Sequence, residues 1–414
     1  MFRNPAIDIV LVVAMAGIAV GRIPRLRMNR PGMALAAATF LVGLGALTPA
    51  AAFAAVDIGT IALLLAMMLV VANLRMAGFF QVAGGRILAV AKGPKTLLAL
   101  VVASSGLLSA FFLNDTICIV FTPLVAEMTR RARRDPLPYL IAVAVSANVG
   151  SEATIIGNPQ NMLIGASSGI PFAEFTARLA PPAIVGLIVA WAVIVLSQPA
   201  EFRSGGRAML APMDETRVEV DRRLIAKSLL AAALMLGLLL VGVDPAIAAL
   251  SAASILLVTR RVDPDRVFAF VDFGLLVFFA GLFVMTKAIE GRGGYEYVAK
   301  TLVPMVAGAG GALPVAPLAG LVAILSNLVS NVPAVMLFRP LMGSFADPHA
   351  AWLVLAMAST FAGNLTLLGS VANLIVAEGA KRSGIDLSFG RYLRVGLPVT
   401  VITIAMGATW IALT

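Results

Sequence analysis

Apolar runs of about 16–25 residues recur from one end of this 414-residue chain to the other. Each run approaches the roughly 20 residues that a helix needs to cross about 30 Å of hydrocarbon. Hydrophobic residues make up 60% of the chain and charged residues 13%, against about 45–50% and about 25% in soluble domains. Because a soluble fold could not bury that excess, the sequence predicts an all-α protein that crosses a bilayer many times.

We predict ten spanning helices and two apolar stretches that are too long for a single span. The spans lie near 5–21, 32–51, 57–74, 137–166, 179–197, 225–242, 245–259, 269–286, 350–377 and 393–413. Polar residues interrupt the two long stretches, 96–128 and 313–343, near their middles, so we expect each to form a re-entrant hairpin. The amphipathic loops 77–92 and 291–306 are expected to lie along the membrane interface.

Lysine and arginine gather on alternate loops, and this pattern predicts the orientation of the chain. Most of the 31 lie in segments that we place in the cytoplasm: 22–30, 75–95, 130–134, 203–227, 260–266 and 381–394. The bias places the N-terminus outside a bacterial-type inner membrane and the first hairpin on the cytoplasmic side. Orientation and lipid headgroups therefore account for the net charge of +10, and no nucleic-acid partner is expected.

Three short signatures occur twice, in the same order and with nearly the same offset. The repeated pairs are 56–59 with 271–274, 114–124 with 331–341, and 154–161 with 366–373. Each half then holds five spans and one hairpin, and this odd number inverts the second half relative to the first. We expect a first repeat at 1–200, a cytoplasmic linker at 201–224 and a second repeat at 225–414.

Inverted repeats are typical of secondary transporters, whose sites lie at mid-membrane where helices are interrupted. A duplicated scaffold without a site is the alternative, but the repeated positions here are polar. We expect non-helical backbone near 148–153 and 361–366, close to both hairpin tips. The candidate substrate and ion ligands are Asn114, Asp115, Thr116, Ser151, Glu152, Thr154, Asn158, Asn161, Ser330, Asn331, Asn364, Thr366, Ser370 and Asn373.

Two of these candidates are acidic, and an acid at that depth costs roughly 2.5–3.5 kcal/mol on insertion scales. Asp115 could carry a coupling proton, help to bind Na⁺ near Asn114 and Ser151, or cap the returning helix. Glu152 is either a coupling residue or an interior hydrogen-bond partner. Their repeat mates, Val332 and Asn364, are neutral, so we expect an asymmetric site with coupling biased toward the first repeat.

Other residue types exclude several classes of protein. With one cysteine, Cys118, and one histidine, His349, the chain predicts no zinc or haem site and no cofactor beyond a coupling ion. We expect Cys118 to pack in the core and His349 to lie at a turn or helix entry. The sequence contains no phosphate-binding G-x-x-x-x-G-K-[ST] segment and no nucleophile–base set, which argues against an enzyme. Asp57 and Asp272 are expected to cap helices.

Four motifs carry a resemblance to a known family: Asn114-Asp115-Thr116 with Thr122-Pro123, Ala153 to Asn161, Ser330-Asn331-Val332-Pro333, and Gly363 to Asn373. Over nearly its whole length the chain resembles the ion transporter superfamily, particularly the arsenite permease and NhaD-type sodium/proton antiporter branch. Divalent-anion/sodium symporters are more distantly similar. The resemblance implies that hairpin tips and adjacent breaks hold substrate and coupling ions, and that a transport domain moves against a scaffold, often within a homodimer.

The symporter relatives carry a Ser-Asn-Thr-like motif at both tips, whereas this chain has an aspartate at one tip and Val332 at the other. This difference disfavours sodium-coupled dicarboxylate transport. We therefore predict a secondary active transporter for a small anion, with an arsenite-like oxyanion first and other inorganic anions or carboxylates next. It would work by alternating access, coupled to H⁺ or Na⁺. Na⁺/H⁺ antiport is the alternative; a channel or the permease subunit of an ATPase-driven pump is less favoured.

Overall fold

The computed structural model describes residues 4–23, 28–203, 220–258, 262–293, 296, 300, 304 and 314–414. In the described residues up to 203, helices are accompanied by two short strands, β1 (Arg22–Ile23) and β2 (Met28–Asn29), which pair antiparallel. The helices of this half are α1 (Pro5–Val20), α2 (Arg30–Gly43), α3 (Pro49–Ala55), α4 (Ile58–Met76), α5 (Phe79–Val90), α6 (Pro94–Phe111), α7 (Asn114–Arg131), α8 (Pro136–Ser151), α9 (Pro159–Ser168), α10 (Phe172–Ser197) and α11 (Pro199–Arg203).

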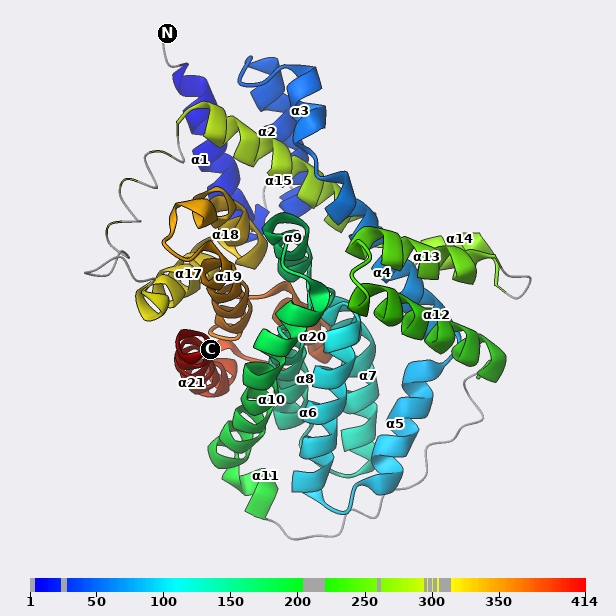
Figure 1. The fold of residues 1–414 in the computed structure, drawn as a ribbon. Helices are drawn as coiled ribbons and strands as arrows, with labels where there is room; N and C mark the ends of the chain where they lie inside the picture. Colours follow the sequence, from blue (N-terminus) through cyan, green and yellow to red (C-terminus); the bar gives the residue numbers. More distant parts are fainter. Residues whose placement is uncertain are drawn as a thin grey trace.

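The second half is helical in the same way (Figure 1). Its helices are α12 (Arg222–Leu240), α13 (Pro245–Leu257), α14 (Pro264–Phe268), α15 (Phe273–Gly291), α17 (Val315–Val329), α18 (Asn331–Phe338), the 3₁₀ helix η3 (Arg339–Ser344), α19 (Pro348–Ala362), α20 (Val371–Arg382) and α21 (Phe389–Leu413). The predicted interfacial loop 291–306 lies largely outside the described residues, whereas the loop at 77–92 contains α5.

Helix starts follow local sequence signals. The Asp57 carboxylate accepts a hydrogen bond from the N–H of Thr60 at 3.0 Å, and Asp272 accepts one from Leu275 at 3.0 Å, so both are N-caps, as predicted. His349 lies in the first turn of α19, as expected, and its Nε2 is 2.9 Å from a carboxylate oxygen of Glu174. Local capping side chains therefore set many helix boundaries.

The polytopic helical fold class is confirmed. In the described part of the chain, six helices (α4, α6, α10, α12, α15 and α21) are long and apolar enough to cross a membrane. Several apolar helices of 10–17 residues accompany them, among them α1, α8, α13, α17 and α19. Cys118 is buried in the core, where it was expected.

Three predicted spans are interrupted in the structure. The span at 32–51 is two helices, because Gly45 ends the first with a positive φ of 76° and Pro49 starts the next. The spans at 137–166 and 350–377 are split by irregular segments at 152–158 and 363–370, here called the first and second breaks.

The breaks begin later than predicted. Residues 148–151 still belong to α8, and residues 361 and 362 still belong to α19. The first break instead ends where Asn158 adopts an extended conformation, with φ −151° and ψ 160°, directly before Pro159. A residue before proline avoids helical geometry, which fixes the end of that break.

Each predicted hairpin is a pair of consecutive, contacting helices that leads into a broken helix. α6 and α7 form the first hairpin and are followed by α8 and α9, while α17 and α18 form the second and are followed by α19 and α20. The same order of elements therefore occurs in both halves.

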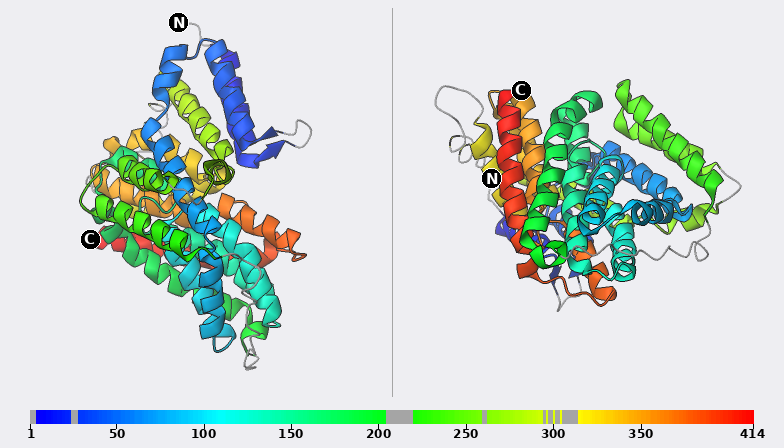
Figure 2. Two further views of the ribbon diagram at one scale, coloured as in Figure 1. Left: turned by 90° about the vertical axis from the view of Figure 1, so that its right-hand side faces the viewer. Right: turned by 90° about the horizontal axis from the view of Figure 1, so that it is seen from below.

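The two central helices bring the halves together. Every residue from Leu137 to Ser151 and from Ala351 to Ala362 is buried, so α8 and α19 lie at the centre of the core. α6 packs on α8, α17 on α19 and α10 on α21. α2 packs along α15, and α13 along α4, in a second group of helices (Figure 1). Figure 2 shows α1 and α2 projecting at one end of the molecule, away from α6 and α7.

Candidate functional site

The first break is organised by two asparagine side chains. The side-chain oxygen of Asn158 caps α9 by accepting a hydrogen bond from the N–H of Asn161 at 2.8 Å. The Asn161 amide nitrogen reaches back to the carbonyl oxygens of Ser151, Glu152 and Thr154 at 3.3, 3.4 and 3.1 Å. Irregular backbone at membrane depth needs such partners, because lipid offers none.

The second break repeats this solution with different caps. The Ser370 hydroxyl accepts a hydrogen bond from the N–H of Ala372 at 3.2 Å. The Asn373 amide nitrogen donates to the carbonyl oxygens of Gly363 and Thr366 at 2.7 and 3.0 Å. Asn373 is the repeat counterpart of the asparagine that spans the first break. The breaks are therefore equivalent in hydrogen bonding as well as in sequence.

Each hairpin tip contacts the break of its own repeat. The N–H of Asn114 donates to the carbonyl oxygen of Gly157 at 3.0 Å. The amide nitrogen of Asn331, in the orientation that satisfies both ends of its amide, donates to the carbonyl oxygens of Gly369 at 3.3 Å and Ser359 at 3.2 Å. Gly157 and Gly369 are repeat mates. The tips and breaks thus form two equivalent halves of one polar centre.

Asn148 joins these halves. Its amide nitrogen donates to the side-chain oxygens of Asn364 at 2.9 Å and Asn373 at 3.0 Å, both in the opposite repeat. Its side-chain oxygen accepts hydrogen bonds from the amide of Asn114 and the hydroxyl of Ser370, each at 3.1 Å. One buried carboxamide therefore ties the first hairpin tip to the second break.

Thr360 is the repeat mate of Asn148 and makes the reciprocal contacts. Its hydroxyl lies 3.3 Å from the amide nitrogens of both Asn158 and Gln160 and 3.4 Å from the side-chain oxygen of Asn161. These distances exceed those around Asn148, because a hydroxyl is shorter than a carboxamide. The link from the second repeat to the first break is consequently the looser of the two.

The two acidic candidates occupy different environments. Glu152 is fully buried at the start of the first break, beside the Thr360 hydroxyl and the Asn161 amide. Neither of its carboxyl oxygens has a hydrogen bond of good geometry among the described residues. Asp115 is only partly buried, in the first turn of α7, where its N–H donates to the side-chain oxygen of Asn114 at 2.9 Å.

The structure brings most of the predicted site residues together, through side chains or carbonyl groups. They are Asn114, Ser151, Thr154, Asn158, Asn161, Asn331, Asn364, Thr366, Ser370 and Asn373. Thr154 joins the centre indirectly, since its hydroxyl donates to the carbonyl oxygen of Ala110 in α6. The side chains of Asp115, Thr116 and Ser330 lie at the tips and make none of the hydrogen bonds described above.

The list of predicted ligands left out Asn148, Thr360 and Gln160, which the structure places in the site. Asn148 and Thr360 are 212 residues apart, the same offset that relates the two breaks, so the internal repeat carried the signal that could have found them. The Ser151 hydroxyl donates to the carbonyl oxygen of Asn148 at 2.8 Å and accepts from the amide of Asn158 at 2.9 Å. Its oxygen is thus engaged within the network. In the described part of the chain, no three His, Cys, Asp or Glu side chains gather to hold a metal.

Comparisons with known proteins agree with this architecture. The family model described as "CitMHS: Citrate transporter" matches residues 9–362. The chain is 30% identical to the silicon efflux transporter LSI3 of Oryza sativa subsp. japonica, over 93% of each chain. It is 25% identical to a Dictyostelium discoideum protein that carries the name arsB, over 98% of this chain and 91% of that one. The fold resembles that of Neisseria gonorrhoeae MtrF, with a TM-score of 0.56 at 13% identity, over 100% of this chain and 95% of that one.

Proposed function

Because this chain belongs to the CitMHS citrate transporter family, we propose that it is a secondary active transporter for a small anion or oxyacid. Its relatives are membrane transporters, and the resemblance to arsenite permeases that the motifs predict is confirmed at the level of the family. The finer proposal is that an arsenite-like oxyanion moves by alternating access, coupled to H⁺ or Na⁺.

The observation that carries this proposal is the polar centre formed by both tips and both breaks. Seven of its side chains are carboxamides or hydroxyls with at most 5% of their surface exposed: Asn114, Asn148, Asn158, Asn161, Asn364, Ser370 and Asn373. Buried amides and hydroxyls that already bond to one another can exchange those bonds for bonds to a small polar ligand. A group of this kind at the interface of two repeats is where a transporter binds its substrate.

The chemistry of this centre favours a small oxyacid over a large carboxylate. Its donors are neutral amides and hydroxyls, and the ionisable side chain buried beside them, Glu152, is acidic. A carboxylate there would repel a multiply charged anion such as citrate at short range. A compact molecule with hydroxyl groups fits these donors and acceptors without that repulsion. Relatives named for silicon efflux and arsB favour the same ligand class.

We propose that the residues that bind the coupling ion lie in the first repeat. The residues equivalent to Asp115 and Glu152 in the second repeat are Val332 and Asn364, which are neutral. Only the first repeat can therefore change charge at these positions. Either carboxylate could bind H⁺, and Asp115 with Asn114 could contribute oxygen ligands to Na⁺. The same acids would bind the transported ion in the alternative function, Na⁺/H⁺ antiport.

We further propose how the chain is oriented in the membrane and that it assembles as a homodimer. The positive-inside pattern supports an external N-terminus in a bacterial-type inner membrane. Repeats at 1–200 and 225–414, joined by a cytoplasmic linker, follow from the internal signatures. A homodimer, in which a transport domain of hairpins and broken helices moves against the group that contains α2, α4, α13 and α15, follows from the family resemblance.

Reconstitution into proteoliposomes tests this function. We expect movement of arsenite or silicate that depends on an imposed pH or Na⁺ gradient, with citrate moved more slowly or not at all. The matched control is the Asn148→Ala protein at equal reconstitution density. Gradient-driven Na⁺ movement without any anion would establish antiport instead. Citrate transport that outpaces both oxyacids would overturn the proposed substrate class.

A further inference from the structure

We propose that the second hairpin, formed by α17 and α18, is a lid that opens at its tip, whereas the first hairpin is a fixed part of the core. The lid covers the site of the proposed function, but the proposal concerns how the site is reached. It rests on a difference between two repeat mates and on the unequal anchoring of the two hairpins.

The tip of the second hairpin is strained. Ser330 has φ 77° and ψ 158°, a region that essentially only glycine occupies without steric cost. Its mate in the first hairpin, Leu113, has φ −52° and ψ 120°, which is ordinary extended geometry. The inverted-repeat fold therefore does not require the strain. Strained backbone persists only where surrounding contacts hold it, and it is concentrated at switches and clamps.

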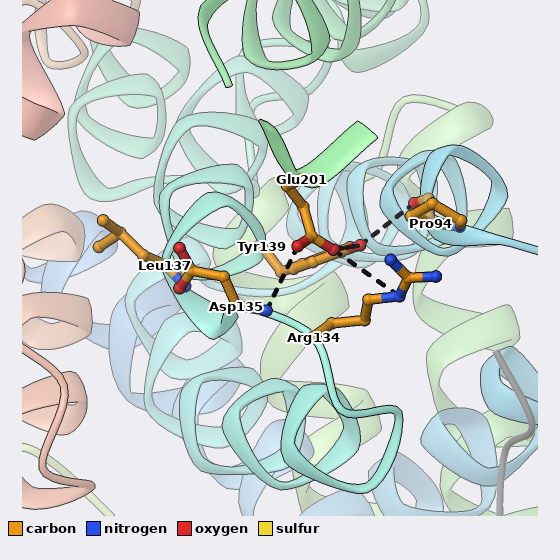
Figure 3. Close-up of polar contacts among 6 residues, drawn as sticks. All are labelled: Pro94, Arg134, Asp135, Leu137, Tyr139 and Glu201. Atoms are coloured by element: carbon orange, nitrogen blue, oxygen red, sulfur yellow. Dashed lines mark hydrogen bonds and ion pairs between the residues drawn. The ribbon is translucent and has the colours of Figure 1, made fainter. Parts of the chain in front are cut away.

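The first hairpin is anchored at its base (Figure 3). The Tyr139 hydroxyl donates to a carboxylate oxygen of Glu201 at 3.0 Å and lies 3.4 Å from the carbonyl oxygen of Pro94, where α6 begins. Glu201 also accepts a hydrogen bond from the N–H of Asp135 at 3.4 Å and lies 3.9 Å from Arg134. This cluster joins α11 and the α7–α8 connection to the start of α6, with side chains largely shielded from solvent.

The first hairpin is also fixed along its length. A Cβ atom on Gly150 would lie 2.1 Å from the carbonyl oxygen of Gly106, so the backbones of α6 and α8 touch directly. Closer to the tip, the Thr154 hydroxyl donates to the carbonyl oxygen of Ala110. At the tip itself, the backbone N–H of Asn114 bonds to the first break. Movement of this hairpin would have to separate close-packed backbone.

Side-chain amides supply the polar contacts that hold the tip of the second hairpin, whose helix α17 also packs on α19. Asn327 donates to the carbonyl oxygen of Ala362 at 3.0 Å, and Asn331 bonds to the second break as described above. Its returning helix α18 has 8 residues, against 18 in α7, and gives way to the 3₁₀ helix η3. Beyond that point Arg339 lies 3.9 Å from Asp57, with 37% and 23% of their side chains exposed.

Together these features describe a lid that the hydrogen bonds of Asn327 and Asn331 hold closed. Hydrogen bonds from side-chain amides to backbone carbonyl oxygens can be replaced by hydrogen bonds to water or to an oxyacid that enters the site. Opening would allow Ser330 to return to ordinary φ. This relief would offset part of the loss of the three hydrogen bonds that the Asn327 and Asn331 amides donate to Ala362, Gly369 and Ser359. The closed and open forms are thereby kept close in free energy, as a lid requires.

Spin-label distance measurements test the lid without any substrate. The chain has one native cysteine, so label pairs are introduced in a Cys118→Ala background. Ile324 in α17 and Val401 in α21 report on the second hairpin, and Leu107 in α6 with Ile188 in α10 reports on the first. All four side chains are 57–61% exposed on the outer surface, so labels should be tolerated. The protein is measured in lipid nanodiscs.

We expect two distance populations for the pair on the second hairpin and one for the pair on the first. Ser330→Gly should reduce the open population about fivefold or more, because glycine removes the strain of the closed form. Ser330→Ala keeps the strain and should leave the populations unchanged, as should the matched change Leu113→Gly in the first hairpin.

A single population at the second hairpin that Ser330→Gly does not alter would overturn the lid, and so would two populations at the first hairpin. Neither result depends on which anion is transported. Failure of the lid is therefore distinguishable from failure of the proposed function, which proteoliposome transport reports separately.

Discussion

Asn148 and Thr360 occupy equivalent positions in the two repeats, yet they serve the site unequally. The carboxamide of Asn148 makes four hydrogen bonds of 2.9–3.1 Å, whereas the Thr360 hydroxyl lies 3.3–3.4 Å from its partners. Asn148, with the shorter hydrogen bonds, contacts neutral Asn364, whereas Thr360, with the longer ones, lies beside Glu152. An acid in the looser half can change its charge or partners without dismantling the whole centre.

Asn148→Ala tests the importance of this tie. It would leave buried groups of Asn364, Asn373 and Ser370 without their partner, and each unsatisfied group costs about 1–3 kcal/mol. We expect the free energy of unfolding to fall by roughly 3 kcal/mol or more. Thr360→Val, which removes only the longer contacts, should cost about 1 kcal/mol. Unfolding in detergent, followed by tryptophan fluorescence, compares them; equal losses would contradict the asymmetry.

Asp115→Asn tests the assignment of coupling. The side chain is partly buried and takes no part in the hydrogen bonds that join tips and breaks, so the variant should fold and insert normally. Removing the titratable charge should abolish dependence on the pH or Na⁺ gradient, while substrate exchange at equilibrium persists. Val332→Ala, at the equivalent position, is the control and should keep wild-type coupling. Wild-type gradient dependence in Asp115→Asn would move coupling to Glu152.

At the scale of elements, the two breaks depend on close backbone contact as much as on polar side chains. A Cβ atom on Gly157 would lie 2.3 Å from the carbonyl oxygen of Ser151, closer than any real contact of this kind. The irregular segment folds back on the end of α8 because this residue lacks a side chain. The first break therefore leaves no room for a side chain at residue 157.

Gly157→Ala should accordingly distort the first break and abolish transport. The matched control is Gly237→Ala in α12, where an added Cβ meets nothing within 4 Å. That change should stabilise its helix by about 0.5–1 kcal/mol and leave transport intact. Transport assays at equal reconstitution density, together with thermal unfolding, separate the two effects. Normal transport by Gly157→Ala would show that the break is not tightly constrained.

For the whole molecule, the interlocking of the halves matters more than either half alone. α8 and α19 are buried along nearly their entire length, and each carries the residue that reaches into the other repeat's break. Neither repeat can complete its polar centre without the other. We therefore expect the halves to fold as one cooperative unit, with an orientation set by the positively charged loops.

Cysteine labelling of intact cells tests that orientation. In a Cys118→Ala background, a membrane-impermeant thiol reagent should modify a cysteine at position 296 but not one at position 207. Permeabilised cells should show labelling at both positions, which controls for reactivity. Labelling of 207 but not 296 from outside would reverse the predicted topology. Labelling of both positions in intact cells would contradict an inverted second repeat.

The sequence by itself determined the membrane class, most helices, their caps and the paired tips and breaks. These features depend on the length of apolar runs, on prolines and on capping side chains, all of which act over a few neighbouring residues. The same local rules divide the predicted span at 32–51, where Gly45 ends one helix and Pro49 begins the next.

Only the tertiary structure decided which residues meet across the repeats and which hairpin is strained. Asn148 reaches partners 216–225 residues away, and no local pattern specifies that contact. Ser330 and Leu113 occupy matching positions, yet only one is forced to positive φ. Such differences arise when two similar halves must pack against each other and compete for the same space, which is a property of the assembled core.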